Sequence, residues 1–193
     1  MPELLHQKLS EKITITEEEY AFFKSFFTVK KLRKRQYLLQ EGDVCKYTAF
    51  VNQGILRSYT VDNKGNEHIL QFAMEGWWMA DLYSFLTGEQ SLFNMEALED
   101  AELLLITHEA WEKLLSQNAK FEHYFRLLIQ NNLIATQRRL MGSLSETAES
   151  KYLKFIESQP ECLQRVPQHM IASFLGITRE TLSRLRKEIS VKQ

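Results

Sequence analysis

The sequence predicts an α+β protein with an N-terminal antiparallel β-roll of the jelly-roll type, a long helix, and a C-terminal helix-turn-helix of the winged-helix type. Two observations predict this fold class. Five of the seven glycines stand at positions 42, 54, 65, 76 and 88, with β-prone segments between them. Short strands with turn signals at such steps are typical of a sandwich or roll. After residue 108 the apolar residues change to helical spacing.

The composition is that of a globular protein. Hydrophobic residues make up 44% of the 193 residues and charged residues 25%, close to ordinary usage. The longest aliphatic run, Leu103–Ile106, is far shorter than the ~20 residues that span a bilayer, and the first residues lack the apolar core of a signal peptide. Cys45 and Cys162 are far apart and form no CxxC pair. We therefore expect a cytoplasmic protein with reduced thiols and no membrane partner.

Charge is distributed unevenly, although the net charge is only -1. From Arg165 onward the chain has six basic and two acidic residues, whereas the rest carries an acidic excess. A basic end on an acidic body indicates a polyanionic partner. The denser cationic run, Lys30–Arg35, is interpreted as a solvated edge before a strand.

Local signals place the elements of the first half. We expect helices over residues 3–12 and 17–27, the second opened by a capping box between Thr16 and Glu19. The segment Asp62–Asn66 is a hairpin turn signal. The roll then spans residues 28–108, with strands at Tyr47–Val51, Ile55–Val61, His68–Ala73, Trp77–Met79, Ser91–Leu98 and Glu102–Thr107.

Residues 120–141 contain no glycine or proline and predict one long helix. Its apolar residues cover more than one face, so that the helix needs two surfaces to bury them. The roll can supply one surface and a second copy of the chain the other; the alternative is a single helix buried inside a monomer. A hinge over 142–150 follows. The expected organisation is a β-roll domain with N-terminal helices at 1–119, a dimerisation helix and hinge at 120–145, and a helix-turn-helix domain at 146–193.

The segment Val166–Leu185 has the pattern of a helix-turn-helix. Pro167 suits a first helical turn, Gly176 suits a turn with positive φ, and Thr178 suits the N-cap of the next helix. The small Ala172 stands where two helices would cross. The apolar residues with the spacing to pack these helices together are Ile171, Leu175, Ile177, Leu182 and Leu185.

The second helix of this motif presents polar residues on one face near its N-terminus, namely Arg179, Glu180, Ser183 and Arg184. A recognition helix places this face in the major groove. Arginine pairs with O6 and N7 of guanine, and glutamate accepts from N4 of cytosine. The alternative is a helical hairpin with a solvated charged face, in a ligand- or protein-interaction module whose helices pack on protein rather than on DNA.

In their order, the roll, the long helix and the helix-turn-helix resemble the Crp/Fnr family of bacterial transcription regulators over nearly the whole chain. The similar residues are Glu41–Asp43, Asn52–Arg57, Gly65–Glu67, Phe72 and Glu75–Gly76 in the roll, and Leu175–Arg184 in the recognition region. The resemblance implies a homodimer that binds a two-fold symmetric site on double-stranded DNA, with RNA polymerase and a small-molecule effector as further partners. The DNA-binding residues that it implies are Thr178, Arg179, Glu180, Ser183, Arg184 and Lys187.

The resemblance also places a candidate effector pocket in the cyclic-nucleotide-binding-like roll. In cAMP-responsive members the glutamate of a Gly-Glu pair holds the ribose, and ten residues later the arginine of an Arg-Ser pair holds the cyclic phosphate. Aligned without gaps, this chain has Ala80-Asp81, then Leu82, and later Ser91-Leu92. Ser91 replaces the phosphate arginine, which removes a charge-assisted pair. The sequence therefore predicts no conventional cAMP site.

The same alignment brings Thr136 and Gln137 of the long helix to the candidate pocket; the alternative is that both are exposed polar residues of a helix. Aromatic residues are frequent around this pocket, at Trp77, Trp78, Tyr83 and Phe85. They suit either an apolar ligand or a filled core, and we favour the filled core. A roll that serves as a dimer scaffold without any ligand is a further alternative.

Other chemistries fit the sequence less well. Oxygen-sensing members of the family hold an iron–sulfur cluster on several N-terminal cysteines, whereas only Cys45 stands there. Haem ligation by His68, His108 or His123 stays open, although a lone histidine is more often structural. A cupin-type metal site needs paired histidines near a carboxylate, and the chain has no His-x-His and no catalytic motif. We expect no catalytic or metal site. We also expect that the wing, the hairpin that commonly follows a recognition helix, is absent or lies before the motif, around Cys162–Val166.

Overall fold

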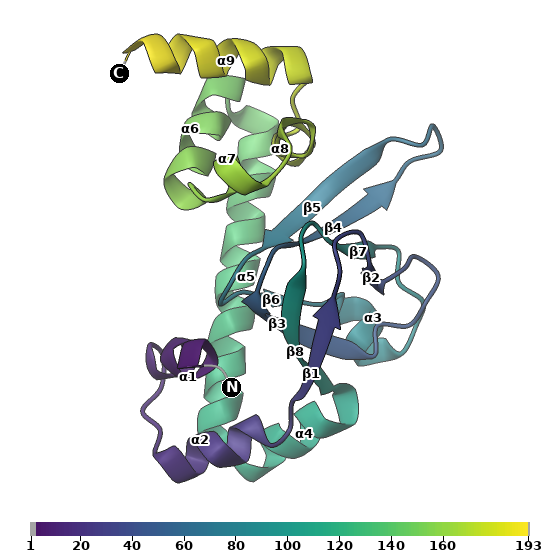
Figure 1. Cartoon of the computed structure of the whole chain (residues 1–193), viewed down its shortest axis with the longest axis vertical. Helices are drawn as coiled ribbons and strands as arrows, with labels where there is room; N and C mark the ends of the chain where they lie inside the picture. Colours follow the sequence, from purple (N-terminus) through teal and green to yellow (C-terminus); the bar gives the residue numbers. More distant parts are fainter. Residues whose placement is uncertain (1–2, 193) are drawn as a thin grey trace. The chain divides into compact units, whose positions relative to one another are not determined.

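The computed structural model describes residues 3–192, which form two compact units. The first unit consists of the chain up to Thr60 together with Gln71–Ile129. The second consists of Val61–Leu70 together with the chain from Gln130 onward. Figure 1 follows the chain from the N-terminal helices through the strands to the C-terminal helices. Within the described range, no helix is both long and apolar enough to cross a membrane.

The predicted β-roll is confirmed as two four-stranded sheets whose strands pair in antiparallel fashion. One sheet has the order β1-β8-β3-β6 and the other β2-β7-β4-β5. In chain order the strands are β1 (Thr28–Leu32), β2 (Tyr37–Leu39), β3 (Tyr47–Gln53), β4 (Leu56–Val61), β5 (Glu67–Ala73), β6 (Trp78–Met79), β7 (Asn94–Ala97) and β8 (Ala101–Thr107).

Strand β8 is buried on both of its faces. Leu103 and Leu105 point into the core between the two sheets, whereas Leu104 and Ile106 point to the opposite side and pack against helices. Successive side chains of a strand alternate between the faces of its sheet, so that a strand covered on both sides is apolar throughout. This explains the aliphatic run in the sequence.

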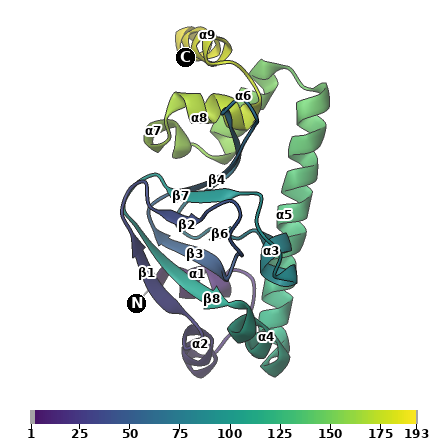
Figure 2. The same cartoon turned by 90° about the vertical axis from the view of Figure 1, so that its right-hand side faces the viewer.

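Four helices supply the outer cover, namely α1 (Glu3–Ser10), α2 (Glu17–Lys24), α4 (His108–Gln117) and the first part of α5 (Ala119–Ser145). Figure 2 shows α2 and α4 beside the start of α5. The predicted capping box of α2 is confirmed, because the N–H of Thr16 donates to Glu19 Oε2 at 2.9 Å and the N–H of Glu19 donates to Thr16 Oγ1 at 3.2 Å. Lys120 Nζ lies 2.7 Å from Glu19 Oε1, and this hydrogen bond is the main cause of a lowered Glu19 pKa.

The sequence patterns do not indicate β1, β2 or α3 (Leu82–Thr87). The interpretation of Lys30–Arg35 as a segment before a strand is wrong in its first part, because Lys30 and Lys31 lie in β1. Strand β1 stands at the edge of its sheet and four of its five residues are exposed, so that no apolar alternation marks it. Helix α3 has only 6 residues between an Asp81 cap and Gly88 at φ +75°, which is too short to show a helical period.

The second unit contains the rest of α5 followed by α6 (Ala148–Ser158), α7 (Cys162–Arg165), α8 (Gln168–Leu175) and α9 (Arg179–Lys192). The predicted hinge over 142–150 is wrong in extent, because α5 continues to Ser145 and Thr147 already caps α6 by accepting from the N–H of Ser150 at 3.2 Å. A wing around Cys162–Val166 is also wrong, since this segment forms α7. From Gly176 to residue 192 the structure contains no strand.

The turn predicted between β4 and β5 is confirmed. Asp62 Oδ1 accepts from the N–H of Lys64 at 2.8 Å and from that of Asn66 at 2.9 Å. Asp62 Oδ2 lies 3.0 Å from Nε2 of His68. The contacts with His68 and then with Asn66 hold the pKa of Asp62 well below its usual value. The tip of this hairpin is therefore tied together by one carboxylate.

Gly54 stands where its own backbone and its neighbours exclude a side chain. Its φ is +92°, and a Cβ would lie 2.7 Å from Asp100 O and 2.8 Å from Ala101 Cα. Gly65 has a similar φ of +82° but open space around it. We predict that Gly54→Ala lowers the free energy of unfolding by roughly 2–4 kcal/mol and Gly65→Ala by only about 1 kcal/mol, since only the first adds a backbone clash to the cost of positive φ.

Chemical denaturation of both variants and of the wild type measures this difference. Equal costs for the two substitutions would show that the chain at Asp100 moves aside, and would contradict the prediction.

Candidate nucleic-acid interface

Helices α8 and α9 pack as a helix-turn-helix, as the sequence predicts. Most of the residues expected at their contact are buried, namely Ile171, Ala172, Leu175, Leu182 and Leu185. Gly176 adopts φ +65° between the helices. Its N–H donates to Ser173 O at 3.1 Å, and the N–H of Ile177 donates to Ala172 O at 3.0 Å. These bonds end α8 and set the direction in which the chain enters α9.

Thr178 caps α9, as predicted. Its Oγ1 accepts from the N–H of Thr181 at 3.2 Å, and its carbonyl accepts from the N–H of Leu182 at 3.0 Å. Pro167 lies one position earlier than expected: it precedes the first residue of α8 with φ -57°, and its carbonyl accepts from the N–H of Met170 at 2.9 Å. The first turn of α8 and that of α9 are therefore each stabilised by a residue that the sequence analysis singled out, Pro167 and Thr178.

The face of α9 that turns away from the packed core carries the predicted DNA-binding residues Arg179, Glu180, Ser183, Arg184 and Lys187, all of them exposed. They lie on one side of the helix because they are spaced at about one turn, while Leu182 and Leu185 point inward. The Arg184 side chain is 71% exposed, and its Nε lies 3.9 Å from a carboxylate oxygen of Glu188. That contact is weak and leaves the guanidinium available to a base.

Glu180 stands in the first turn of α9. Hydrogen bonds from its own backbone N–H and then from the Thr178 side chain lower the pKa of its carboxyl. The group is therefore ionised at neutral pH and offers acceptor oxygens. The interface thus presents cationic donors and an anionic acceptor on adjacent residues, which is the set needed to distinguish a guanine from a cytosine edge.

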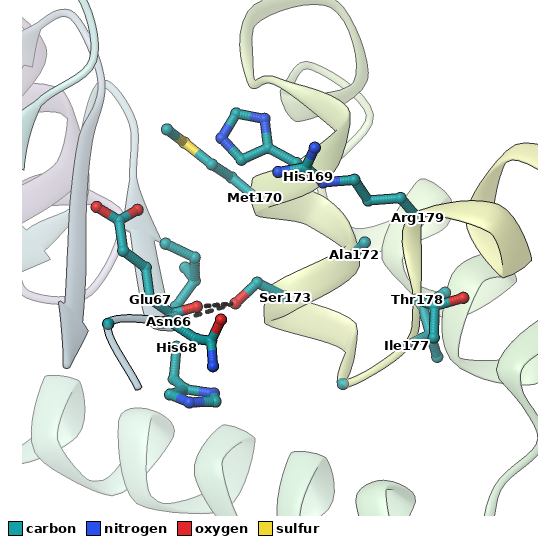
Figure 3. Close-up of a pocket in the computed structure, with 13 residues that line it drawn as sticks. Asn66, Glu67, His68, His169, Met170, Ala172, Ser173, Ile177, Thr178 and Arg179 are labelled. Atoms are coloured by element: carbon teal, nitrogen blue, oxygen red, sulfur yellow. Dashed lines mark hydrogen bonds between the residues drawn. The ribbon is translucent and has the colours of Figure 1, made fainter. Parts of the chain in front are cut away.

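The sequence predicts the β4–β5 hairpin but not its contact with this motif within the second unit. Residues Gly65–Ile69 of the β4–β5 hairpin line an open groove of about 680 Å³ together with α8 and the start of α9. In Figure 3 Ser173 points from α8 to the hairpin, and the Arg179 side chain extends over α8 toward His169. A serine in a helix has no pattern in sequence that would mark such a contact.

In the first unit, Asp81 and Ser91 of the candidate effector pocket bond to each other. The Ser91 hydroxyl donates to Asp81 Oδ2 at 2.7 Å, while Asp81 Oδ1 accepts from the N–H of Ser84 and caps α3. Both side chains are buried, at 4% and 1% exposure. The two residues that the ungapped alignment predicts at the ribose and phosphate positions are thus hydrogen-bonded to each other.

The other pocket candidates lie in different surroundings. Ala80 packs against the core of the roll, whereas Leu82 and Leu92 are 39% and 71% exposed. Thr136 and Gln137 are exposed residues of α5 in the second unit. A groove of about 500 Å³ lies nearby in the roll, lined by Leu38, Leu39, Gly42, Asp43, Val44, Cys45, Lys46, Tyr47, Gln90 and Met95. None of the candidates lines that groove.

The aromatic residues of this region divide into core and surface. Trp78 packs against Phe50 with ring centroids 5.3 Å apart, and its Nε1 donates to Tyr124 OH at 3.1 Å. Phe85 is 4% exposed, whereas Trp77 and Tyr83 are 38% and 60% exposed. The filled-core interpretation therefore holds for Trp78 and Phe85 but not for the other two.

Helix α5 changes character along its length. Its first turns bury Phe121, Tyr124 and Phe125. Further along, its large apolar side chains are exposed, namely Ile129, Leu133, Ile134, Leu140, Met141 and Leu144, at 42% to 82%. The alternative of a helix wholly buried in one chain is therefore wrong.

Histidines and cysteines have local structural partners. Among residues 3–192, no three His, Cys, Asp or Glu side chains are grouped as metal ligands would be. His108 packs edge-on to Phe85 at 5.2 Å, and His123 Nδ1 lies 2.6 Å from an Arg126 nitrogen. Cys45 and Cys162 form no disulfide, and burial raises the pKa of both thiols, that of Cys162 to about 11.

Comparison with known proteins gives both sequence and structural relatives. Residues 29–118 match the cyclic nucleotide-binding domain. The fumarate and nitrate reduction regulatory protein of Vibrio cholerae is 27% identical over 169 residues, which are 81% of this chain and 66% of that protein. The regulatory protein HlyX of Actinobacillus pleuropneumoniae is 26% identical over 190 residues, 89% of this chain and 76% of that protein. This chain thus spans about two thirds of the Vibrio protein's length.

The solved structure of FixK2 from Bradyrhizobium japonicum has a TM-score of 0.72 at 21% identity, covering 86% of this chain and 85% of that one. This likeness shows the fold. The chain is thus similar to bacterial regulatory proteins, matches a cyclic nucleotide-binding domain over residues 29–118, and shares its fold with FixK2.

Proposed function

We propose that the chain is a homodimeric, sequence-specific DNA-binding transcription regulator whose β-roll senses an effector other than cAMP. The observation that carries this proposal is the exposed face of α9 with Arg179, Glu180 and Arg184. The helix that bears them is fixed by the Thr178 cap and by packing on α8. Fixed presentation matters because base edges are distinguished by bidentate hydrogen bonds of defined geometry.

The exposed apolar residues of α5 support a homodimer. Ile129, Leu133, Leu140 and Leu144 follow one another at steps of four, seven and four residues, so that they form one stripe along the helix. A second copy of the same helix would cover this stripe, as in a two-stranded helical packing. Two recognition helices related by two-fold symmetry then read half-sites about one DNA turn, ~34 Å, apart.

The Asp81–Ser91 hydrogen bond supports an effector other than cAMP. A cyclic phosphate in this position would meet a carboxylate already bonded to a hydroxyl, and position 91 carries a serine rather than an arginine that could balance the two negative charges. We propose a different small molecule as the effector, and the roll as a pure dimer scaffold is the alternative. RNA polymerase is the further partner through which such a regulator would act at a promoter.

Base reading by α9 can be tested on a site selected from fragments of the source genome. We predict that Arg184→Ala weakens binding to the selected duplex by roughly 1–3 kcal/mol and relaxes its preference at one base pair, whereas Lys187→Ala weakens binding to all duplexes alike and lowers the salt slope by about 1. Arg33→Ala is the matched control, since it removes the same charge from an exposed site in the other unit. Fluorescence anisotropy against salt measures all three.

Equal weakening of selected and scrambled duplexes by Arg184→Ala would contradict base reading. If the wild type selects no DNA and shows no affinity at physiological salt, the protein-interaction module becomes the better account.

The apolar stripe of α5 predicts the oligomeric state. We expect Leu133→Glu with Leu140→Glu to convert the dimer into a monomer at micromolar concentration and to abolish binding to a symmetric site, because each interface would bury unpaired carboxylates. Both leucines are exposed in one chain, at 56% and 60%, so the fold of the single chain should survive. Asn131→Glu, on the same helix, is the control. Sedimentation equilibrium measures the oligomeric state of all three proteins. A monomeric wild type would contradict the proposed dimer.

The hydrogen bond between Asp81 and Ser91 in the roll predicts that the protein does not respond to cAMP. Millimolar cAMP should leave both the melting temperature and the affinity for the selected duplex unchanged, since a ligand that binds only the folded state would raise Tm. Differential scanning fluorimetry measures the first and anisotropy the second. A rise of several degrees, or tighter DNA binding with cAMP, would show that Asp81 and Ser91 separate to admit the nucleotide.

A further inference from the structure

The tip of the β4–β5 hairpin (Val61–Leu70, called the hairpin tip below) is hydrogen-bonded to the helix-turn-helix through one side chain. The Ser173 hydroxyl donates to Glu67 O at 2.9 Å and accepts from the N–H of Ile69 at 3.1 Å. Both partners are backbone groups two residues apart on the same strand. One serine thus uses its donor and its acceptor to hold a strand segment against α8, as Figure 3 shows.

A second side chain reaches the same strand from α5. Arg139 donates from Nη1 to Leu70 O, and its guanidinium lies 5.0 Å from the centre of the Phe174 ring. Phe174 follows Ser173 directly in α8. Residues Glu67, Ile69 and Leu70 are therefore bonded through their backbone to side chains of two helices.

Ser173 also belongs to the turn that orients α9. Its carbonyl accepts from the N–H of Gly176 at 3.1 Å, so that one residue joins the hairpin tip with its side chain and the turn with its backbone. A displacement of the hairpin tip would act on the last turn of α8, from which Gly176, Thr178 and α9 follow.

The contact does not cover the DNA-reading face. Arg179, Glu180, Ser183 and Arg184 stay exposed while Ser173 is bonded to the hairpin tip. Arg179 and Thr178 line the open groove whose other side is formed by the hairpin tip. The conformation with the contact formed is thus compatible with DNA binding, and the contact restricts the motion of α8 and α9 within it.

We propose that Ser173 is a positioning residue, which holds the hairpin tip on α8 so that the recognition helix keeps its DNA-binding orientation. The inference rests on the proposed function. Because β4 and β5 continue from the hairpin tip into a sheet of the roll, a change in that sheet would alter DNA affinity through this contact. Ser173 itself contacts no base in this account.

The test compares Ser173→Ala with Ser173→Thr, which keeps the hydroxyl, and with Ser158→Ala. The control removes an exposed serine hydroxyl that bonds only within its own helix α6. We expect Ser173→Ala to weaken binding to the selected duplex by roughly 5- to 20-fold, from the loss of two hydrogen bonds, with an unchanged salt slope because the substitution removes no charge. Ser173→Thr should recover most of the affinity, and Ser158→Ala should match the wild type.

Amide hydrogen exchange measured on the same proteins reports the contact directly. Faster exchange in residues 62–70 of Ser173→Ala, with Tm close to that of Ser158→Ala, is the expected result. Wild-type affinity in Ser173→Ala would overturn the proposal.

Failure of the proposed function gives a different result. In that case the wild type binds no selected duplex, and the proposed positioning role of Ser173 in DNA binding is wrong as well. Exchange in residues 62–70 then still shows whether Ser173 holds the hairpin tip. If the wild type binds and Ser173→Ala binds equally well, only the positioning role is wrong.

Discussion

Strand β8 has to bury both of its faces, and the first unit is organised around that requirement. Its inward leucines fill the space between two sheets, and its outward residues Leu104 and Ile106 need a cover that a two-sheet roll does not provide. The N-terminal helices, α4 and the first turns of α5 supply this cover. Hence α5 begins as a packed core helix, and its later apolar residues are left exposed for another surface. The need to cover β8 therefore positions the first turns of α5, the helix whose later residues we propose as the dimer contact.

Polar groups inside the roll are paired within the protein itself. Arg57 and Glu96, both buried, join β4 to β7 with Nη2 2.6 Å from Oε2, and the Arg57 guanidinium lies 4.0 Å from the centre of the Tyr59 ring. Removing one partner of such a pair costs roughly 3–5 kcal/mol, because the other charge stays buried. The Asp81–Ser91 pair follows the same rule on a smaller scale. Under the proposed function, an effector that enters the roll would have to replace such bonds.

The elements found from the sequence are those with a strong local signal. Gly176 needs positive φ, Thr178 caps the next helix, and Thr16 with Glu19 forms a capping box; each is decided by residues within one turn of each other. The segments that the sequence did not predict are those without a clear periodic pattern. Strand β1 is a cationic edge strand with four exposed residues, and α3 is a six-residue helix. The predicted hinge starts too early, at Gly142. A glycine lowers helix propensity but does not by itself end a helix, and α5 continues through Gly142 to Ser145.

The sequence by itself determined the order of roll, long helix and helix-turn-helix, and the residues on the outward face of α9, because periodicity and caps are local properties. Only the tertiary structure decided that Asp81 bonds Ser91 and that the backbone of Glu67 and Ile69 bonds Ser173. Ser173 and Glu67 are 106 positions apart, and the hairpin contributes a main-chain carbonyl and a main-chain N–H, which every residue type except proline carries. No residue pattern records such a contact, since its geometry arises only when separate segments of the chain have folded together.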